Sequence, residues 1–183
     1  VGEPTGMVPL VGHKGGLEMI TEIKGSSGHS SDPRGKVNSL YYAAKLISFI
    51  ENLNRDLSLS TNKDTPFNPP YSTLSVGYIK GGQARNIIPN YCYFDWEIRP
   101  LPEDDPYLIL SKIKTYASKI LEPEMKKNFE GSEIIMTEVS FCPPMEARFE
   151  SPALDLINKL WKINEPSVAS YGTDGGHFQS IGI

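Results

Sequence analysis

The sequence is poor in the residues that build metal centres and disulfide frameworks. Among its 183 residues are only two cysteines and three histidines. None of the histidines belongs to a short ligand pair such as His-x-His, whereas catalytic zinc sites are rich in imidazole ligands. Because there are only two cysteines, we expect reduced thiols in a cytoplasmic protein and not a disulfide. We therefore expect that this chain by itself does not build a complete histidine-rich metal site.

Long apolar runs and a strong charge of one sign are missing as well. No apolar run approaches the ~20 residues of a membrane-spanning helix, and the first residues lack the pattern of a signal peptide. The 18 basic residues are balanced by 22 acidic ones, and no basic stripe runs along the chain. These absences argue against a membrane or a nucleic acid as the main partner.

The length and the two ends suggest a piece of a longer protein. A chain of 183 residues fits one domain, or one domain with a fragment of another. It opens on an apolar-Gly-acid-Pro turn without a methionine and closes on Gly182-Ile183 without a charged tail. We expect both ends to be cut points in a longer parent.

Strand patterns occur in four segments, which are 17–24, 73–80, 91–99 and 133–141. The alternation is cleanest in 91–99. Cys92 and Trp96 share the face that we expect to pack against helices. Asp95 and Arg99 share the face that we expect to meet solvent or a ligand.

Two amphipathic helices separate these strands. Residues 37–55 carry one apolar stripe at helical spacing, and a second helix begins at Asp105-Pro106, with proline at the first helical position. The order of elements is then β-α-β-β-α-β. This order predicts an α+β fold, the ferredoxin-like sandwich, with a four-stranded antiparallel sheet and two helices on one face.

The last 40 residues do not fit this sandwich. Ser151-Pro152 begins a third predicted helix that runs to about residue 163, and the glycine-rich segment 171–177 is predicted to be a loop. We expect the helix to find a surface on the sandwich or on a second copy, because each apolar side chain gains ~1.5–3 kcal/mol when fully buried. Its apolar stripe consists of Leu154, Ile157, Leu160 and Trp161.

Three polar side chains outside the apolar stripes could carry chemistry. His29 lies in a loop of glycine and serine, either as a solvated or capping histidine or as a donor to an oxyanion. Asn86 lies in a glycine-led connection, which is either a plain hairpin or presents an amide to a ligand, and which lacks the pattern of a phosphate loop. Arg99 either pairs with Glu97 or Asp95 or clamps a substrate carboxylate.

Several motifs also stand in the order seen in one family. They are Gly2-Glu3-Pro4-Thr5, His13-Lys14-Gly15, Gly28-His29-Ser30-Ser31, Gly81-Gly82 through Asn86-Ile87-Ile88-Pro89, and Glu97-Ile98-Arg99-Pro100. Together they resemble the dinuclear-zinc amidohydrolases over nearly the whole chain. Within that family, residues 121–125 and 171–178 are most similar to the acetylornithine deacetylase branch.

The resemblance implies a zinc-binding α/β catalytic domain that is interrupted by an inserted lid, or dimerisation, domain. In this sequence the lid would span residues 16–143, and residues 1–15 and 144–183 would be remnants of the catalytic domain. The parent would be a homodimer joined through the lid. A non-enzymatic dimerisation module remains an alternative, because an exposed edge strand can pair with its twin, and so does a ferredoxin-like domain of unrelated function.

The resemblance also implies roles for individual residues. His29 would reach into the partner subunit's active site and polarise the scissile carbonyl. Asn86 and Arg99 would hold the substrate, Arg99 through its carboxylate. The Gly172-Thr173-Asp174 loop would line the substrate pocket, and Glu3 would be a carboxylate ligand to one zinc ion.

The parent reaction would be attack of a zinc-bound hydroxide on an N-acyl amino acid, with N-acetylornithine expected as substrate. A succinyl-diaminopimelate desuccinylase or a related peptidase is the alternative within the family. The family's His-x-Asp ligands, its Glu-Glu pair and its last histidine ligand have no counterpart between Val1 and Ile183. His13 and His177 match no catalytic role, and we expect them to be structural. We therefore expect this chain alone to be inactive and to bind zinc weakly or not at all.

Overall fold

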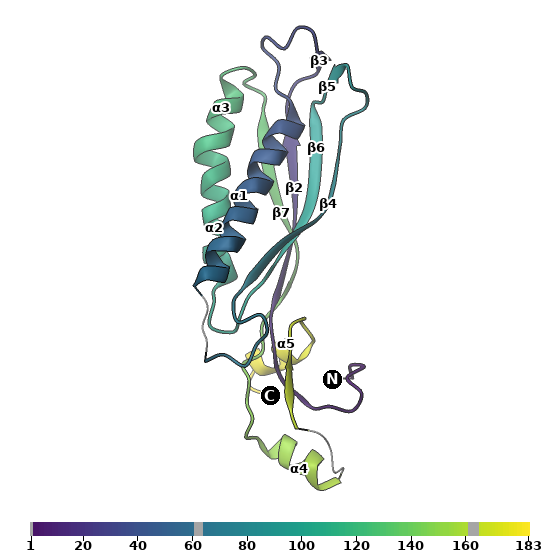
Figure 1. The fold of residues 1–183 in the computed structure, drawn as a ribbon, viewed down its shortest axis with the longest axis vertical. Coiled ribbons are helices and arrows are strands. Elements are labelled where there is room, and N and C mark those ends of the chain that lie inside the picture. Colours follow the sequence, from purple (N-terminus) through teal and green to yellow (C-terminus); the bar gives the residue numbers. More distant parts are fainter. Residues whose placement is uncertain (1, 61–63, 161–164) are drawn as a thin grey trace.

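A four-stranded sheet is the central element of the computed structural model, which describes residues 2–60, 64–160 and 165–183. Its order is β4-β6-β2-β7, and all neighbours are antiparallel. The strands are β2 (Gly16–Lys24), β4 (Thr73–Gly81), β6 (Tyr91–Arg99) and β7 (Glu133–Cys142). Figure 1 shows the β-α-β-β-α-β order, so the predicted α+β, ferredoxin-like sandwich is confirmed.

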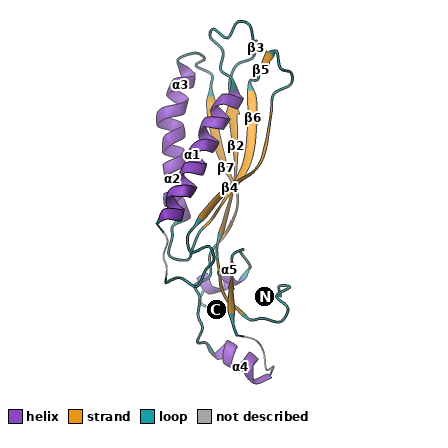
Figure 2. Cartoon of the chain, viewed as in Figure 1, coloured by secondary structure: helices purple, strands orange, loops and turns teal. Residues whose placement is uncertain are grey.

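The two long helices cover one face of this sheet and leave the other face open (Figure 2). Helix α1 spans Ser39–Leu59, four residues beyond the predicted end, and helix α2 begins at Pro106. Each is capped by the residue before it, since Asn38 and Asp105 accept a hydrogen bond from a backbone N–H of the first turn. In the described part of the chain, no helix is both long and apolar enough to cross a membrane.

The second helical segment changes its geometry along its length. Helix α2 (Pro106–Tyr116) runs into a π-helical turn, η1 (Ala117–Leu121), and then into α3 (Glu122–Lys126). The wide turn comes just before Pro123, which has no N–H to donate to the preceding turn. The three pieces together follow the sheet from one end to the other (Figure 1).

The hydrophobic core lies between the sheet and the helices. On β6 the four inward side chains are at most 3% exposed, which confirms the predicted inward face. The indole N–H of Trp96 donates to the Thr21 hydroxyl at 2.8 Å, so the polar groups of both side chains are satisfied inside the core. The largest fully buried apolar side chains of this core are Leu17, Met19, Ile23, Leu46, Ile50, Phe94, Ile98, Ile113, Leu121 and Met125.

Two β-bulges lie at the same level of the sheet. Between Val76 and Tyr78 the register of β4 against β6 shifts, so Gly77 is the extra residue. Opposite Glu18 and Met19 the register of β7 against β2 shifts, so Val139 is the extra residue. Bulges bend a strand and increase its twist, and Figure 1 shows a strongly twisted sheet.

Two short strand pairs were not predicted. At one end of the molecule, β1 (Leu10–His13) pairs in parallel with β8 (Ser167–Ala169). At the opposite end, which we call the tip, β3 (Gly28–His29) pairs with β5 (Ile87–Ile88). Pairs of two to four residues are too short to leave a periodic pattern in the sequence.

The predicted loop at 171–177 is wrong in its second half, because helix α5 (Gly175–Ser180) begins inside it. Gly176 is buried, and a Cβ atom at that position would collide with the carbonyl oxygen of Pro143. The glycine is therefore explained by close packing of the short helix against the chain after β7, and it is not a loop residue.

Of the stripe of the third predicted helix, two side chains find no surface on the sandwich, and cover by a second copy stays a prediction. Helix α4 (Pro152–Leu160) buries Leu154, but Ile157 is 42% exposed and Leu160 is 76% exposed. Trp161 lies outside the described residues. The sandwich therefore does not cover this helix.

Candidate functional site

The tip of the sandwich brings two of the predicted site residues together. His29 on β3 faces Ile87 on β5 in the strand pairing, and Asn86 directly precedes that residue. The backbone N–H of Ser30 donates to the carbonyl oxygen of Asn86 at 3.0 Å. Both predicted side chains are exposed. The tip, where β3 and β5 lie side by side (Figure 1), therefore carries an exposed histidine on β3 and an exposed asparagine just before β5.

The hydrogen bonds of His29 define which ring nitrogen can act as a donor. Its Nδ1 accepts from the backbone N–H of Ser31 at 3.3 Å and lies 2.7 Å from the Ser31 hydroxyl. A neutral imidazole with an accepting Nδ1 carries its proton on Nε2. Nε2 has no hydrogen-bond partner among the described residues. His29 can therefore donate to a carbonyl oxygen outside the chain.

Arg99 lies at the opposite end of the sheet from His29. Its Nη2 pairs with Oε2 of Glu97 at 2.6 Å, and the two side chains are 29% and 33% exposed. The structure therefore contains the ion pair with Glu97, which was expected from the sequence as the alternative to binding a substrate carboxylate. From its first to its last residue, strand β6 extends about 27 Å. The structure does not bring His29 and Arg99 together in one chain.

The predicted pocket loop lies at the same end as Arg99. The Cys142 thiol donates to the carbonyl oxygen of Thr173 at 3.3 Å, and a Cβ atom at Gly172 would lie 2.8 Å from Cys142 Sγ. Burial raises the pKa of the Cys142 thiol, while the nearby charge of Arg99 lowers it. Arg99, Gly172 and Thr173 therefore surround one partly buried cysteine.

Glu3 also lies at this end, close to a buried histidine. Burial lowers the pKa of His13, and the charge of Glu3 acts in the opposite direction. His13 Nδ1 lies 2.9 Å from the carbonyl oxygen of Lys14, and Nε2 accepts the backbone N–H of Gly176 at 3.0 Å. Both nitrogens are thus occupied by backbone groups, which fits the structural role expected of His13.

The zinc pair implied by the resemblance does not fit the residues of this chain alone. Among the described residues, no group of three or more His, Cys, Asp or Glu side chains is placed to hold a metal ion. In the part of the chain that the structure describes, Glu3 therefore belongs to no such group, and both ring nitrogens of His13 contact backbone groups. We derive no metal-dependent step from this chain.

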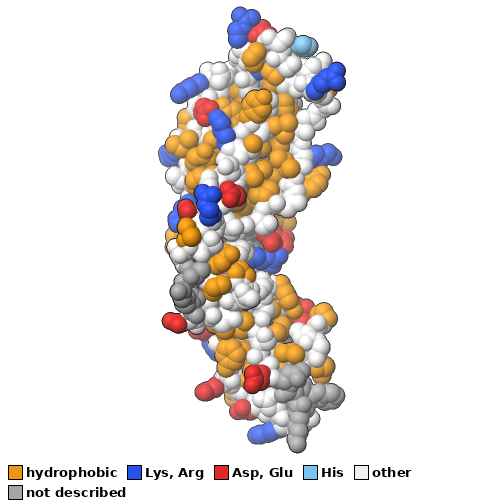
Figure 3. Space-filling view, viewed as in Figure 1, with side chains coloured by type: hydrophobic (Ala, Val, Ile, Leu, Met, Phe, Trp, Pro, Cys, Tyr) orange, Lys and Arg blue, Asp and Glu red, His pale blue; other side chains and the backbone are white. Residues whose placement is uncertain are grey.

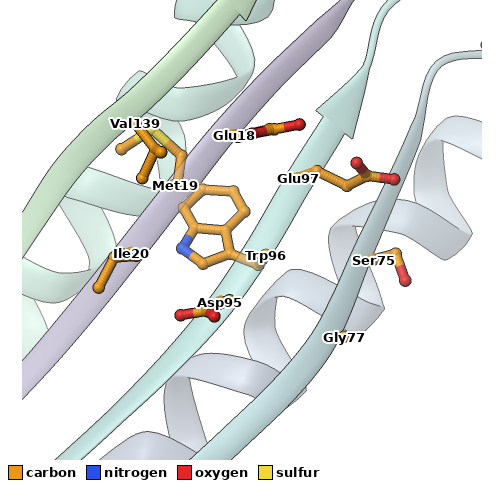
Figure 4. A pocket seen from close by; sticks show the side chains of 9 residues that line it. All are labelled: Glu18, Met19, Ile20, Ser75, Gly77, Asp95, Trp96, Glu97 and Val139. Atoms are coloured by element: carbon orange, nitrogen blue, oxygen red, sulfur yellow. The ribbon is translucent and has the colours of Figure 1, made fainter.

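A hollow on the open face of the sheet was not predicted (Figure 4). It has a volume of about 290 Å³ and lies between the two bulges, which contribute Gly77 and Val139 to its wall. Its polar side chains are the Ser75 hydroxyl and three carboxylates, from Glu18, Asp95 and Glu97. The alternation along 91–99 correctly places Asp95 and Glu97 on the side that was expected to meet solvent or a ligand. The two bulges beside the hollow could not be predicted, because they leave no pattern in the sequence.

Comparison with known proteins identifies the class of protein to which this fold belongs. The sequence pattern of the peptidase dimerisation domain matches residues 11–125. This chain belongs to that family, the dimerisation domains of the M20 metallohydrolases. The matched range contains the whole tip and strands β2, β4 and β6.

Curated relatives match along the whole chain. An acetylornithine deacetylase from Myxococcus xanthus is 29% identical over 183 residues, which is 100% of this chain and 46% of the relative. An acetylornithine deacetylase from Photorhabdus laumondii is 34% identical over 181 residues, 99% of this chain and 45% of the relative. The chain thus spans about half the length of these curated relatives.

Solved structures of low sequence identity share the fold. Aminopeptidase PepT from Bacillus cereus superposes with a TM-score of 0.68 at 18% identity, covering 95% of this chain and 43% of that one. The M20 family metallo-carboxypeptidase Sso-CP2 from Sulfolobus solfataricus gives 0.60 at 20% identity, covering 97% and 58%. At such identities the likeness concerns the arrangement of helices and strands.

Proposed function

We propose that this chain is the lid, with flanking parts of the catalytic domain, of a zinc-dependent amidohydrolase that removes the acyl group from an N-acyl amino acid. N-acetylornithine is the proposed substrate, because relatives at 29% and 34% identity carry the name acetylornithine deacetylase. The residues of this chain bind and orient the substrate in that proposal. Glu3 would be one ligand of a metal site whose other ligands belong to the rest of the protein.

The observation that carries this proposal is the separation of the two groups of site residues. His29 and Asn86 lie at the tip, and Arg99 is the last residue of β6, a strand that extends about 27 Å from its start near the tip. A small N-acyl amino acid cannot contact both ends of one lid. Two copies related by a two-fold axis can place the tip of one beside the base of the other. His29 of one subunit would then donate from Nε2 to the acyl carbonyl, while Arg99 of the other binds the carboxylate.

A homodimer is supported by an incompletely covered edge of the sandwich. Strand β4 ends the sheet on one side, so its outer backbone groups have no strand partner within the sheet. On α1 the side chain of Tyr41 is 69% exposed, and on the helix-facing side of β4 the side chain of Ile79 is 48% exposed. Figure 3 shows hydrophobic side chains gathered over this face, along α1 and the strands beside it.

Complementation between two inactive variants of the full-length protein tests the arrangement. His29→Gln and Arg99→Gln should each lose most activity on N-acetylornithine as pure homodimers. After the two are mixed and allowed to exchange subunits, one site of each mixed dimer contains both intact residues, and about one quarter of the wild-type activity should return. Measured rates of acetate release before and after exchange give the answer.

The same assay separates the alternatives. Failure to regain activity, with subunit exchange verified by mass spectrometry, would place both residues in one subunit's site and contradict the proposal. Faster release of succinate from N-succinyl-diaminopimelate than of acetate would favour the desuccinylase branch. A full-length dimer that cleaves neither compound with added zinc would contradict both deacylase assignments and favour a related peptidase or a dimerisation role.

A further inference from the structure

A second cavity lies at the tip end of the open sheet face, and we call it the tip cavity. It has a volume of about 330 Å³ and lies between the end of β4, the start of β6 and the connection that carries β5. It is separate from the acidic hollow, because the two share no lining residue. Its principal side chains are Lys80, Gln83, Ile87, Asn90, Tyr91 and Tyr93.

One wall of the tip cavity is aromatic and held in place by a hydrogen bond and by ring contacts. The rings of Tyr91 and Tyr93 are 6.1 Å apart and inclined at 39°. The Tyr91 hydroxyl donates to Glu22 Oε1 at 2.6 Å, a bond that raises the pKa of Tyr91 to about 12. Tyr93 also packs against Tyr78, with ring centroids 5.8 Å apart. The wall is therefore formed before any ligand arrives.

The connection that carries β5 supplies further apolar groups to the cavity. Ile87 and Pro89 line it, and Ile87 remains 38% exposed although it is a large apolar side chain. Together with the tyrosine rings, these side chains make the larger part of the cavity wall apolar, as in other ligand pockets. A flat apolar group that enters the cavity would contact both the tyrosines and this connection.

The polar part of the tip cavity is suited to an anion. Lys80 lines it, is exposed, and forms no ion pair with any residue that the structure describes. Ser27, Gln83 and Asn90 add a hydroxyl and two amides that can donate hydrogen bonds. The lining contains no aspartate or glutamate. A cation with neutral donors and apolar walls favours a ligand with one negative charge.

We propose that the tip cavity binds a small organic carboxylate with a flat apolar group. The carboxylate would lie against Lys80, and the apolar group would lie among Tyr91, Tyr93 and Ile87. Because Ile87 belongs to β5, an occupied cavity would also hold the connection next to Asn86 against the sheet. This inference does not require the chain to be part of an enzyme.

A titration of the isotope-labelled 183-residue chain followed by NMR tests the proposal, with phenylacetate as the probe. Saturable shifts are expected at the backbone amides of Gly81, Gly82, Gln83 and Asn90. Phenylacetamide has the same ring without the charge, and it should bind about two- to five-fold more weakly. The Lys80→Gln variant should weaken phenylacetate to the level of phenylacetamide and leave phenylacetamide unchanged.

Matched variants make the result decisive. Lys24→Gln removes a cation from the same sheet face but outside the cavity, where Lys24 pairs with Glu133, and it should leave phenylacetate binding unchanged. Tyr93→Leu should weaken both probes. The absence of saturable shifts, shifts at other residues, or equal affinities of the two probes for the wild type would each overturn the proposal.

Discussion

His13 and Gly176, which are 163 positions apart in the chain, are joined by a hydrogen bond of 3.0 Å from the glycine N–H to Nε2 of the buried imidazole. This bond needs an unprotonated Nε2. Burial lowers the pKa of His13 below 6.5, so the unfolded chain takes up the proton more readily than the folded one. The stability linked to this group is complete above pH 6.5 and is lost as the pH falls through the lowered value.

We therefore predict that the free energy of unfolding decreases between pH 7.5 and pH 5.5, and that His13→Gln reduces this decrease. Urea unfolding at both pH values, followed by tryptophan fluorescence and circular dichroism, measures the difference. Glutamine keeps an acceptor near the position of Nε2 and does not titrate. Equal losses of stability in wild type and variant would show that His13 is not the group responsible.

The glycine on the other side of that bond gives a second prediction. Gly176→Ala should destabilise the fold by about 1–3 kcal/mol, because its Cβ atom would meet the backbone of Pro143. Gly77→Ala is the matched control, since a Cβ atom there has no neighbour within 4 Å. Thermal unfolding of both variants should show a lower Tm only for Gly176→Ala.

Lys14 gives a third prediction, because its side chain is buried at the junction between β1 and the sandwich. Its ammonium group donates to the carbonyl oxygen of Tyr71 at 2.7 Å, and burial lowers the pKa of Lys14. Lys14→Met should cost about 1–3 kcal/mol, because the carbonyl loses its donor. The exposed pair of Lys24 and Glu133 is the comparison, and Lys24→Met should change the free energy of unfolding by less than about 1 kcal/mol. Similar effects of the two substitutions in urea unfolding would contradict the assignment.

The exposed edge beside α1 gives a fourth prediction. Under the proposed homodimer, Tyr41→Glu combined with Ile79→Glu should give a monomer by light scattering, because two carboxylates would be buried at the interface without partners. Circular dichroism should show an intact fold, since both side chains are exposed in one chain. Leu108→Glu on α2, where the side chain is 64% exposed, should leave the dimer intact. Dissociation by Leu108→Glu alone would instead place the interface on the α2 side.

Local patterns predicted the sandwich well because each strand and helix of the sandwich is long enough to show its period. The alternation in 91–99 gave both the bounds of β6 and its buried face. Asp105-Pro106 marked the start of α2 correctly. The pattern failed where packing decided the outcome, as at Gly176, where two adjacent glycines indicated a loop and the structure has a short helix.

For the candidate site as well, the sequence predicted some features and missed others. Motifs and resemblance selected His29, Asn86 and Arg99, and their roles remain predictions. The sequence did not show that His29 and Asn86 lie together at the tip while Arg99 lies at the other end of the sheet. Those positions depend on the pairing of β3 with β5 and on the length of β6. Nor did the sequence indicate the acidic hollow or the tip cavity, whose walls come from several strands.

By itself, then, the order of residues determined the layers of this protein, its inward and outward faces and its likeness to one family, because periodicity and motifs are properties of neighbouring residues. Only the tertiary structure decided which distant groups meet, such as His13 with Gly176 or Cys142 with Thr173. Such contacts form only when segments far apart in the sequence are brought together, and this depends on how the whole chain between them folds.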